Sequence, residues 1–431
     1  MNTARRNARG EASLRRILDA TLQLVSQYGY DDTTIARITK ATQLPASSIY
    51  WYFENKDDLI AAALESFYTR FIRTRRSWEG FDRSRSLLGQ LLDELEPELR
   101  ASESEEPLRL GIMLALEGDA AQPKIQEPFQ RRRAGALARI EAWWDAAFAA
   151  FGAAGDGRSF GTWWMATLTL AYLDGHYISD GLVDHRAAAH RSRIVAYSLA
   201  GAFEALRRSE EVAAPRKTDI DASREIPASR EAPDDHSTGP AALLRVTRSL
   251  VAERGYDGAT IRRICAAAGI QRSSAYWRYK DKDALVKAAV SEPFLALFAP
   301  LRALPESAKD WPANLADALR AAVRSAHAQP ETVKAGLLLR IRRWDEPTSS
   351  GGAVLDGIAT TEASLAAWFD RVLPAGNGAE PMGEHLAWTV VRLTEGLMLV
   401  SALGRPVPAE SVGGIVAAMF ASVLDHWPAG V

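Results

Sequence analysis

Apolar residues recur at helical spacing along almost the whole chain. Near its start, Leu14, Ile17, Leu18, Thr21 and Val25 lie three or four residues apart, which places them on one face of a helix. Glycine and proline cluster between such segments, as in EPMGEH and GRPVPAE. No stretch alternates apolar and polar residues over the length of a strand. The pattern predicts an all-α protein with about nine helices in each half of the chain.

A long stretch of the sequence occurs twice. YGYDDTTIARITKATQLPASSIYWYFENKDDL at 28–59 aligns without a gap with RGYDGATIRRICAAAGIQRSSAYWRYKDKDAL, 226 residues further on. A looser echo downstream pairs EAWWDAAFAAFG with LAAWFDRVLPAG, and LAYLDGH around Asp174 with VRLTEGL around Glu395. Because the period exceeds 200 residues, the repeat indicates two tandem units and not a solenoid of short repeats.

The join between the two units differs in composition from the rest. The segment 209–239 is rich in proline, serine, alanine and charge, and it has no apolar stripe that a helix could bury, so it predicts a flexible linker. The repeat and the linker together predict five regions: a first head at 1–55, a first body at 56–208, the linker at 209–238, a second head at 239–281 and a second body at 282–431.

The repeated stretch predicts two short helices joined by a tight turn. Thr34 can cap a helix over 35–42, and the next helix begins near Pro45 and runs about two turns to Phe53. Asn55 can then cap a further helix that has acidic residues in its first turn. Two short helices joined in this way form a helix-turn-helix, whose second helix is the candidate for the major groove of DNA.

The second short helix ends in a cluster of aromatic residues. Ile49 and Phe53 are expected in the core, as aromatic and aliphatic residues at helical spacing usually are. Tyr50, Trp51 and Tyr52 are consecutive, so one helix cannot bury all three. At least one is therefore expected on the surface, where it needs a partner.

In its order of residues, this stretch resembles the DNA-binding domain of the TetR family of transcriptional regulators. The resemblance rests on a G-Y-x-x-T-T-I-x-x-I segment followed by S-S-x-Y-W-Y-F-x-N-K-x-x-L, and it covers about 45 residues in each half. It implies an all-α protein of two tandem TetR-like units. Each unit would have an N-terminal three-helix DNA-binding domain and a C-terminal helical body for effector binding and dimerisation.

Carried over position by position, the resemblance implies DNA contacts from both heads. The basic run at the N-terminus, which includes Arg5 and Arg6, resembles the arm that some family members lay along the minor groove, although a solvated tail remains the alternative. In the first head the implied contacts are Thr34, Ala46, Ser47, Ser48, Tyr50, Trp51, Tyr52 and Lys56. In the second head they are Thr260, Arg272, Ser273, Ser274, Tyr276, Trp277, Arg278 and Lys282.

The two heads differ in residues that matter for recognition. The glycine usual in the family's turn is kept at Gly269 but replaced by Gln43, where a left-handed backbone would be strained. Arg272 stands where the first head has Ala46, and an arginine can pair with guanine through two hydrogen bonds whereas an alanine cannot. We therefore expect a non-palindromic operator.

Members of the family normally act as symmetric dimers, so this chain is expected to fold as an intramolecular pseudo-dimer. The contact is predicted from the last two helices of each half, near 158–207 and 382–426, with Gly175 and Gly396 among the small residues that allow close packing. We expect Gly181 and Gly404 to allow close packing in the same way. A dimer of chains with four heads is the competing assembly.

Aromatic residues in the two bodies are candidates for a pocket that binds a hydrophobic or planar effector, with Asp174 and His176 as polar anchors. Filling of the helical cores is the alternative. The candidates are Trp143, Trp144, Trp163, Trp164, Tyr172, Asp174, His176, Trp344, Trp368 and Trp388.

Composition restricts the remaining possibilities. The net charge of −2 means that any DNA contact must come from local patches, and no apolar run or leader-like segment predicts a membrane span or export, so we expect a cytoplasmic protein. Cys265 is the only cysteine, and no motif of a hydrolase, nucleotide-binding enzyme or metalloprotease occurs. We therefore expect no catalytic site, cofactor or metal.

The sequence thus predicts a transcriptional regulator, with repression and release by a small molecule implied by the resemblance. A scaffold or adaptor that has kept the fold and lost one or both DNA contacts is the alternative.

Overall fold

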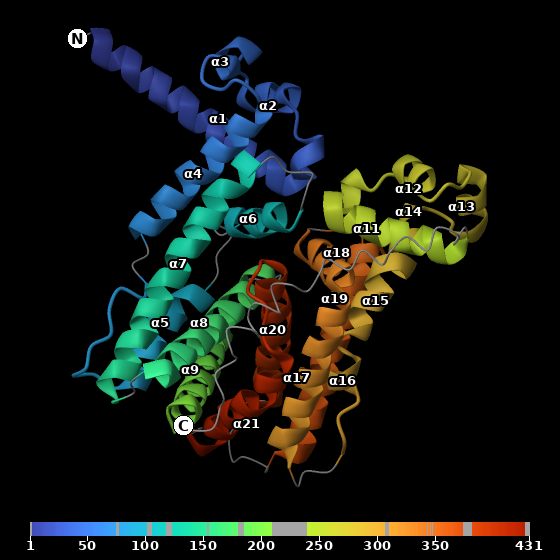
Figure 1. Ribbon diagram of the computed structural model, residues 1–431. Helices are drawn as coiled ribbons and strands as arrows, with labels where there is room; N and C mark the ends of the chain where they lie inside the picture. Colours follow the sequence, from blue (N-terminus) through green and yellow to red (C-terminus); the bar gives the residue numbers. More distant parts are fainter. Residues whose placement is uncertain are drawn as a thin grey trace.

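The computed structural model of the protein is built from helices arranged as two units (Figure 1). The predicted linker at 209–238 lies outside the residues that the structure describes. Those residues are 2–74, 77–100, 106–117, 123–152, 155–179, 185–208, 239–306, 310–342, 344, 346, 348–373 and 382–426. Within them every regular element is a helix, which confirms the predicted fold class.

The first unit has a head of three helices and a body that begins with α4. Its helices are α1 (Asn2–Asp32), α2 (Ile35–Thr42), α3 (Ala46–Tyr50), α4 (Lys56–Thr74), α5 (Leu87–Leu99), α6 (Glu106–Leu116), α7 (Pro123–Ala150), α8 (Gly155–Ile178) and α9 (His185–Arg208).

The second unit repeats this order with more breaks. Its elements are α11 (Pro240–Gly258), α12 (Ile261–Ala267), α13 (Arg272–Arg278), α14 (Lys282–Val286), the π-helix η2 (Lys287–Ser291), α15 (Glu292–Ala296), α16 (Ala299–Arg302), α17 (Trp311–Ala328), α18 (Pro330–Ile341), α19 (Ser350–Val372), α20 (Met382–Ala402) and α21 (Ala409–His426).

Counted over the residues that the structure describes, the expectation of about nine helices per half is correct for the first unit and wrong for the second. Where the first unit has the single helix α4, the second has four short pieces between 282 and 302. Pro293 and Pro300 lie in the first turns of α15 and α16. Because proline has no N–H to donate to the preceding turn, a continuous α-helix is not favoured there, and α4 contains no proline.

Local capping fixes the helices of the heads as the sequence predicts. The Thr34 hydroxyl accepts a hydrogen bond from the Arg37 N–H at 3.3 Å, and Thr260 does the same for Arg263 at 3.3 Å. Asn55 accepts from the Asp58 N–H at 2.9 Å, just ahead of α4. These caps confirm the predicted starts of α2 and α4, whereas α3 is shorter than expected and ends at Tyr50.

The two bodies meet along α8 and α20, with α9 and α21 beside them (Figure 1). A Cβ atom added to Gly175 on α8 would overlap the backbone carbonyl of Arg392 on α20. One added to Gly396 on α20 would overlap the backbone carbonyl of Ala171 on α8. In the LAYLDGH and VRLTEGL echo, Gly175 corresponds to Gly396 and Ala171 to Arg392. The contact is therefore reciprocal, as across a twofold axis. We call it the seam.

For Gly181 and Gly404, the other two glycines predicted to allow close packing, the described residues show no close contact at the seam. Gly181 lies outside the described residues. Gly404 has a φ of 90° and no atom within 4 Å of an added Cβ, so it serves the turn after α20 and not close packing.

Buried charges accompany the seam on both sides. On α20, Glu395 is fully buried and pairs with Arg340 Nε at 2.8 Å and with Arg392 Nη1 at 2.9 Å, and Arg392 also pairs with Glu362. At the corresponding place on α8, the carboxylate of Asp174 accepts two hydrogen bonds from the Arg133 guanidinium, at 2.7 and 2.6 Å. Pairing of this kind is what makes a buried charge tolerable.

We expect Gly175→Ala and Gly396→Ala each to destabilise the chain by about 1–3 kcal/mol, because the added methyl group would force α8 and α20 apart. Alanine in a helix interior otherwise stabilises relative to glycine by about 0.5–1 kcal/mol. Gly414→Ala on α21, where an added Cβ meets no atom within 4 Å, is the matched control and should stabilise. Urea unfolding midpoints measure all three, and stabilisation by Gly175→Ala would contradict the close contact.

Candidate nucleic-acid interface and ligand cavities

An exposed tyrosine–tryptophan pair lies at the C-terminal end of each of the short helices α3 and α13. Tyr50 is 56% exposed and Trp51 78%, and in the second head Tyr276 is 53% exposed and Trp277 82%. The opposite face of α3 is anchored by the fully buried Ile49. The expectation that the consecutive aromatic residues cannot all be buried is therefore confirmed, and the same two positions are exposed in both heads.

Tyr52 is held differently from its neighbours. It is half-buried, its hydroxyl donates to the Gly10 carbonyl at 3.1 Å, and its ring lies edge-on to Trp51 at 4.6 Å between centroids. Tyr52 thus ties the end of α3 to α1 and supports the exposed Trp51 from behind. Phe53 and Tyr279 are partly buried against the core, as the sequence indicates.

The first turns of α3 and α13 present small or basic side chains. Ala46 and Ser47 are exposed and Ser48 is half-buried, whereas Arg272, Ser273 and Ser274 are all exposed. Thr34 and Thr260, which cap the preceding helices, are exposed as well. Small side chains leave room for a close approach of the backbone to a nucleic acid, and an arginine adds a long reach and a charge.

The turn before α3 and the turn before α13 each contain one residue with a left-handed backbone conformation. Gly269 has a φ of 66° and Gln43 a φ of 53°. The glutamine therefore makes the same turn in a backbone region that disfavours a Cβ by about 1–2 kcal/mol, as the sequence predicts.

Lys56 and Lys282 have a structural role that the sequence did not predict. Lys56 Nζ donates to the Tyr30 carbonyl at 2.8 Å and lies 3.7 Å from the centre of the Tyr30 ring. Lys282 makes the same contacts with Tyr256, at 2.6 and 3.7 Å. Both lysines are half-buried and fasten the start of the body to the end of the long first helix of the head. This task is additional to the DNA contact that the resemblance implies.

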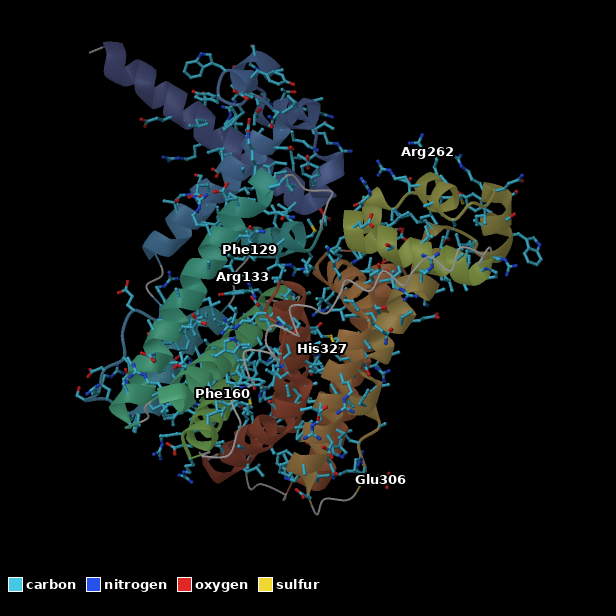
Figure 2. The ribbon with its side chains drawn as sticks, in the orientation of Figure 1. Phe129, Arg133, Phe160, Arg262, Glu306 and His327 are labelled. Atoms are coloured by element: carbon cyan, nitrogen blue, oxygen red, sulfur yellow. The ribbon has the colours of Figure 1, made fainter. Side chains whose placement is uncertain are left out.

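The two heads differ in charge along the same stretch. From 34 to 56 there are three basic residues and one acidic residue, and from 260 to 282 there are six basic residues and one acidic residue. Arg278 lies over the Trp277 ring with its guanidinium carbon 5.6 Å from the ring centre. Figure 2 shows Arg262 at the outer edge of the second head, pointing away from the body. The second head is thus the more strongly basic one.

Five exposed basic residues on or next to these elements were not among the sequence-based candidates. They lie on α2 and α12 and just after α13, where the alternation of small and basic residues could have drawn attention to them. They are Arg37, Lys40, Arg262, Arg263 and Lys280. For Arg5 and Arg6 the structure gives the backbone, which is helical as part of α1, while their side chains lie outside its description.

Most of the aromatic candidates for a ligand pocket lie in the cores of the bodies. Trp143, Trp144 and Trp164 in the first body are buried, and the rings of Trp143 and Trp144 meet edge-to-face at 4.8 Å. Trp163 and Trp344 are half-buried. The other buried candidates are Tyr172, Asp174, His176, Trp368 and Trp388.

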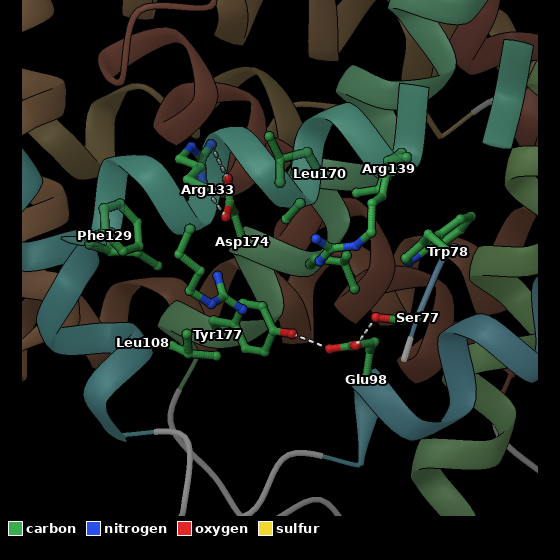
Figure 3. Close-up of a pocket in the computed structure, with 15 residues that line it drawn as sticks. Ser77, Trp78, Glu98, Leu108, Phe129, Arg133, Arg139, Leu170, Asp174 and Tyr177 are labelled. Atoms are coloured by element: carbon green, nitrogen blue, oxygen red, sulfur yellow. Dashed lines mark hydrogen bonds and ion pairs between the residues drawn. The ribbon is translucent and has the colours of Figure 1, made fainter. Parts of the chain in front are cut away.

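A small inner cavity lies inside the first body, between α5, α7 and α8 (Figure 3). Its volume is about 50 Å³, and the ion pair of Arg133 with Asp174 forms one of its walls. Opposite, Glu98 accepts hydrogen bonds from Tyr177 and from Ser77, the latter at 2.9 Å. Since ligand pockets measure roughly 300–1,000 Å³, this cavity suits water better than an effector.

A larger cavity of about 530 Å³ opens at the seam and takes its walls from both bodies. The first body contributes residues of α7 and α8, among them Trp163, and the second contributes the end of α20 and the turn that follows it. Its lining consists of Gln130, Arg133, Ala134, Leu137, Trp163, Leu170, Val400, Leu403, Gly404, Arg405 and Pro406. We call it the seam cavity. Of the aromatic candidates, Trp163 lines this cavity, and the candidate anchor Asp174 lines the inner one.

Two general properties bear on function. No helix among the described residues is long and apolar enough to span a membrane. Within the same residues, no group of three or more histidine, cysteine, aspartate or glutamate side chains is arranged to hold a metal ion. Cys265 is buried in the second head.

Comparison with known proteins identifies the heads. The family described as "Bacterial regulatory proteins, tetR family" matches twice, at residues 17–63 and at 243–289. The chain is 32% identical over 57 residues to the biofilm operon icaADBC HTH-type negative transcriptional regulator IcaR of Staphylococcus epidermidis, a match that covers 13% of this chain and 31% of that protein. It is 39% identical over 51 residues to the HTH-type transcriptional regulator AcrR of Shigella flexneri, which covers 12% of this chain and 24% of that protein.

The chain thus matches less than a third of the length of either curated relative. The two family matches lie at the same separation as the sequence repeat and coincide with the two helix-turn-helix heads. The chain therefore carries two domains of the tetR family in tandem.

Proposed function

We propose that this protein is a DNA-binding transcriptional repressor that reads an operator through two unequal heads and is released by a small molecule. The observation that carries the proposal is the exposed tyrosine–tryptophan pair at the end of both recognition helices, which leaves more than half of each side chain in solvent. Exposed rings of this size on a small helical head favour an interface.

In this proposal the recognition helices lie in successive major grooves. Ser47, Ser48, Ser273 and Ser274 allow close approach to base edges and phosphates, and the hydroxyls of Tyr50 and Tyr276 reach phosphate oxygens. Arg272 reads a base in one half-site, which the first head cannot do through Ala46. The remaining contacts are those implied for Thr34, Trp51, Tyr52, Lys56, Thr260, Trp277, Arg278 and Lys282, with Arg5 and Arg6 near the minor groove.

One chain supplies both halves of the DNA-binding unit, with heads at 1–55 and 239–281. The reciprocal approach of Gly175 and Gly396 supports this, because it has the form of a twofold dimer contact made within one chain. A further dimer of chains would present four heads and protect a longer stretch of DNA.

Repression is supported by the word "negative" in the name of the Staphylococcus epidermidis relative, which describes that protein. Release works by population shift: the effector binds more tightly to the arrangement of bodies in which the heads are wrongly spaced for DNA. A protein that acts on the chromosome in this way works in the cytoplasm.

The first experiment is a gel shift with footprinting on the intergenic DNA beside the protein's own gene, over a range of salt concentrations. Two unlike half-sites, with affinity that falls steeply as salt rises, would support the proposal. A palindromic footprint would indicate two chains that use the same head. No specific binding at low salt would favour an adaptor that has lost its DNA contacts.

We expect Arg272→Ala to weaken operator binding by about 1–3 kcal/mol and to relax sequence preference in one half-site alone, because the bidentate contact of an arginine is lost there. Arg207→Ala on α9, which removes a surface ion pair with Glu204 on the same helix, is the control and should leave binding unchanged. Half-site selection from randomised DNA measures both. Equal loss of preference in the two half-sites would contradict two different reading heads.

We expect Trp51→Ala and Trp277→Ala to weaken DNA binding several-fold while changing the free energy of unfolding by no more than about 0.5 kcal/mol, because both side chains are largely in solvent. Ile49→Ala, at a fully buried position of the same helix, should instead destabilise by about 2–5 kcal/mol. Urea unfolding and gel shift on the same preparations separate the two effects. A marked loss of stability in the tryptophan variants would mean that the rings serve the fold.

A further inference from the structure

The seam cavity has the size of a small-molecule site and is shared by the two bodies. Its volume of about 530 Å³ falls within the range of ligand pockets, roughly 300–1,000 Å³. Trp163 and Leu137 line it from the first body, and Leu403 and Arg405 line it from the second. An occupant would therefore touch both units at once.

Two arginines, Arg133 and Arg405, are among the residues that line this cavity, and each pairs with a carboxylate that does not line it. Arg133 is held from behind by Asp174 through two hydrogen bonds of 2.7 and 2.6 Å. Arg405 is held by Glu141 at 2.9 Å, by the Thr167 hydroxyl at 2.7 Å and by the Trp163 carbonyl at 3.2 Å. These contacts fix both side chains in place, which lowers the entropy lost when a ligand binds.

The two arginines also act on each other. Burial lowers the pKa of Arg405, the charge of Arg133 lowers it further, and Glu141 partly offsets both effects. Like charges that face one space gain from an anion placed between them. A guanidinium can bind a carboxylate through charge-assisted hydrogen bonds that a neutral polar group does not match.

The rest of the lining is mainly apolar. Leu137, Leu170, Val400 and Leu403 contribute aliphatic side chains, and Pro406 is a further apolar residue of the lining. The Arg405 guanidinium carbon lies 4.9 Å from the centre of the Trp163 ring, so that ring holds the arginine and is less available for stacking on a ligand. Such a site suits a hydrocarbon chain or small ring that ends in one acidic group.

We propose that the seam cavity binds a small apolar carboxylate, with the carboxylate between Arg133 and Arg405 and the hydrocarbon part against Leu137 and Leu403. This proposal rests on the function proposed above, since it names the chemical class and the place of the effector. The site differs from the aromatic pocket within each body that the sequence suggested, because it is built across the seam.

The position of the cavity links its occupancy to the DNA-binding heads. Arg405 belongs to the turn that follows α20, and it crosses to α7 and α8 of the other unit. A carboxylate bound to Arg405 competes with Glu141 for its guanidinium and so weakens a contact that holds the two bodies together. By thermodynamic linkage, a ligand that weakens DNA binding by a given factor is itself bound more weakly by the same factor when DNA is present.

The test compares three ligands that share one hydrocarbon chain: octanoate, octan-1-ol and octylammonium. Calorimetric titration of the full chain should show octanoate binding at least about tenfold more tightly than octan-1-ol, because a charge-assisted hydrogen bond is added, and octylammonium binding least. Equal affinity for the three, or no binding of octanoate, would overturn the proposal.

Two variants and a control locate the site. Arg405→Gln should abolish the preference for octanoate over octan-1-ol. Leu137→Trp, at a half-buried position, fills the cavity and should lower the affinity for both ligands at least about tenfold, whereas Leu137→Met keeps the volume and should retain binding. Thermal unfolding without ligand checks that each variant is folded. If Arg405→Gln does not fold, the Leu137 pair still decides, and unchanged octanoate binding by folded Leu137→Trp would place the ligand elsewhere.

DNA binding is measured separately, so that the two proposals fail independently. Octanoate binding at the seam without any specific DNA binding would overturn the proposed repressor and leave the carboxylate site standing. Specific DNA binding without a preference for octanoate over octan-1-ol would support the proposed DNA-binding regulator and overturn the carboxylate site. If both hold, octanoate should weaken operator binding in the wild-type chain and in Leu137→Met, and not in Leu137→Trp.

Discussion

The close approach of the α8 and α20 backbones is the constraint on which the rest of the molecule depends. Gly175 meets the Arg392 carbonyl and Gly396 meets the Ala171 carbonyl, so neither helix can carry a side chain at the crossing point. Close backbone contact brings the flanking side chains of both bodies into one shared interior. It also fixes the angle between the bodies, and the heads are fastened to these bodies through Lys56 and Lys282. What happens at the seam therefore bears on how the heads are presented.

Buried carboxylates next to these glycines reinforce the same constraint. Glu395 and Asp174 occupy corresponding positions, and each forms ion pairs with arginine within its own unit. Because a buried charge without its partner is costly, these networks penalise any shift that separates α20 from α18 or α8 from α7. Bodies that are internally stiff and meet at one close contact will move as units, and this is the kind of motion that could couple a ligand to the spacing of the heads.

The sequence was sufficient for features that depend on neighbours along the chain. Three local features follow from such rules, and the structure agrees with each: the caps at Thr34 and Asn55, the left-handed turn at Gln43, and the exposure of at least one of the consecutive residues 50–52. The repeat placed the two heads because its residues are nearly contiguous in both copies.

Features that depend on distant residues could not be predicted in the same way. The seam cavity is lined by Leu137, Trp163 and Arg405. Arg405 lies more than 200 residues after the other two in the sequence, and no local pattern relates it to them. The aromatic content of the bodies suggested a pocket, but most of those rings pack against each other, because a tryptophan at helical spacing serves a core as readily as a ligand. The division of 282–302 into four short helices follows from two prolines, and their effect was not predicted from the sequence.

Fusion of the two units permits asymmetry that a symmetric dimer would not. In a homodimer a substitution at the seam appears on both sides of the axis, so an arginine in place of Ala171 would have to fit twice. In this chain Arg392 is the counterpart of Ala171 in the repeat, and it is buried beside Glu395 and Glu362 in the second unit alone. The same freedom allows a basic second head beside a less basic first head. Because the two halves are one chain, their association also does not depend on protein concentration, so one ligand bound between the two bodies acts on a pair of heads that never separates.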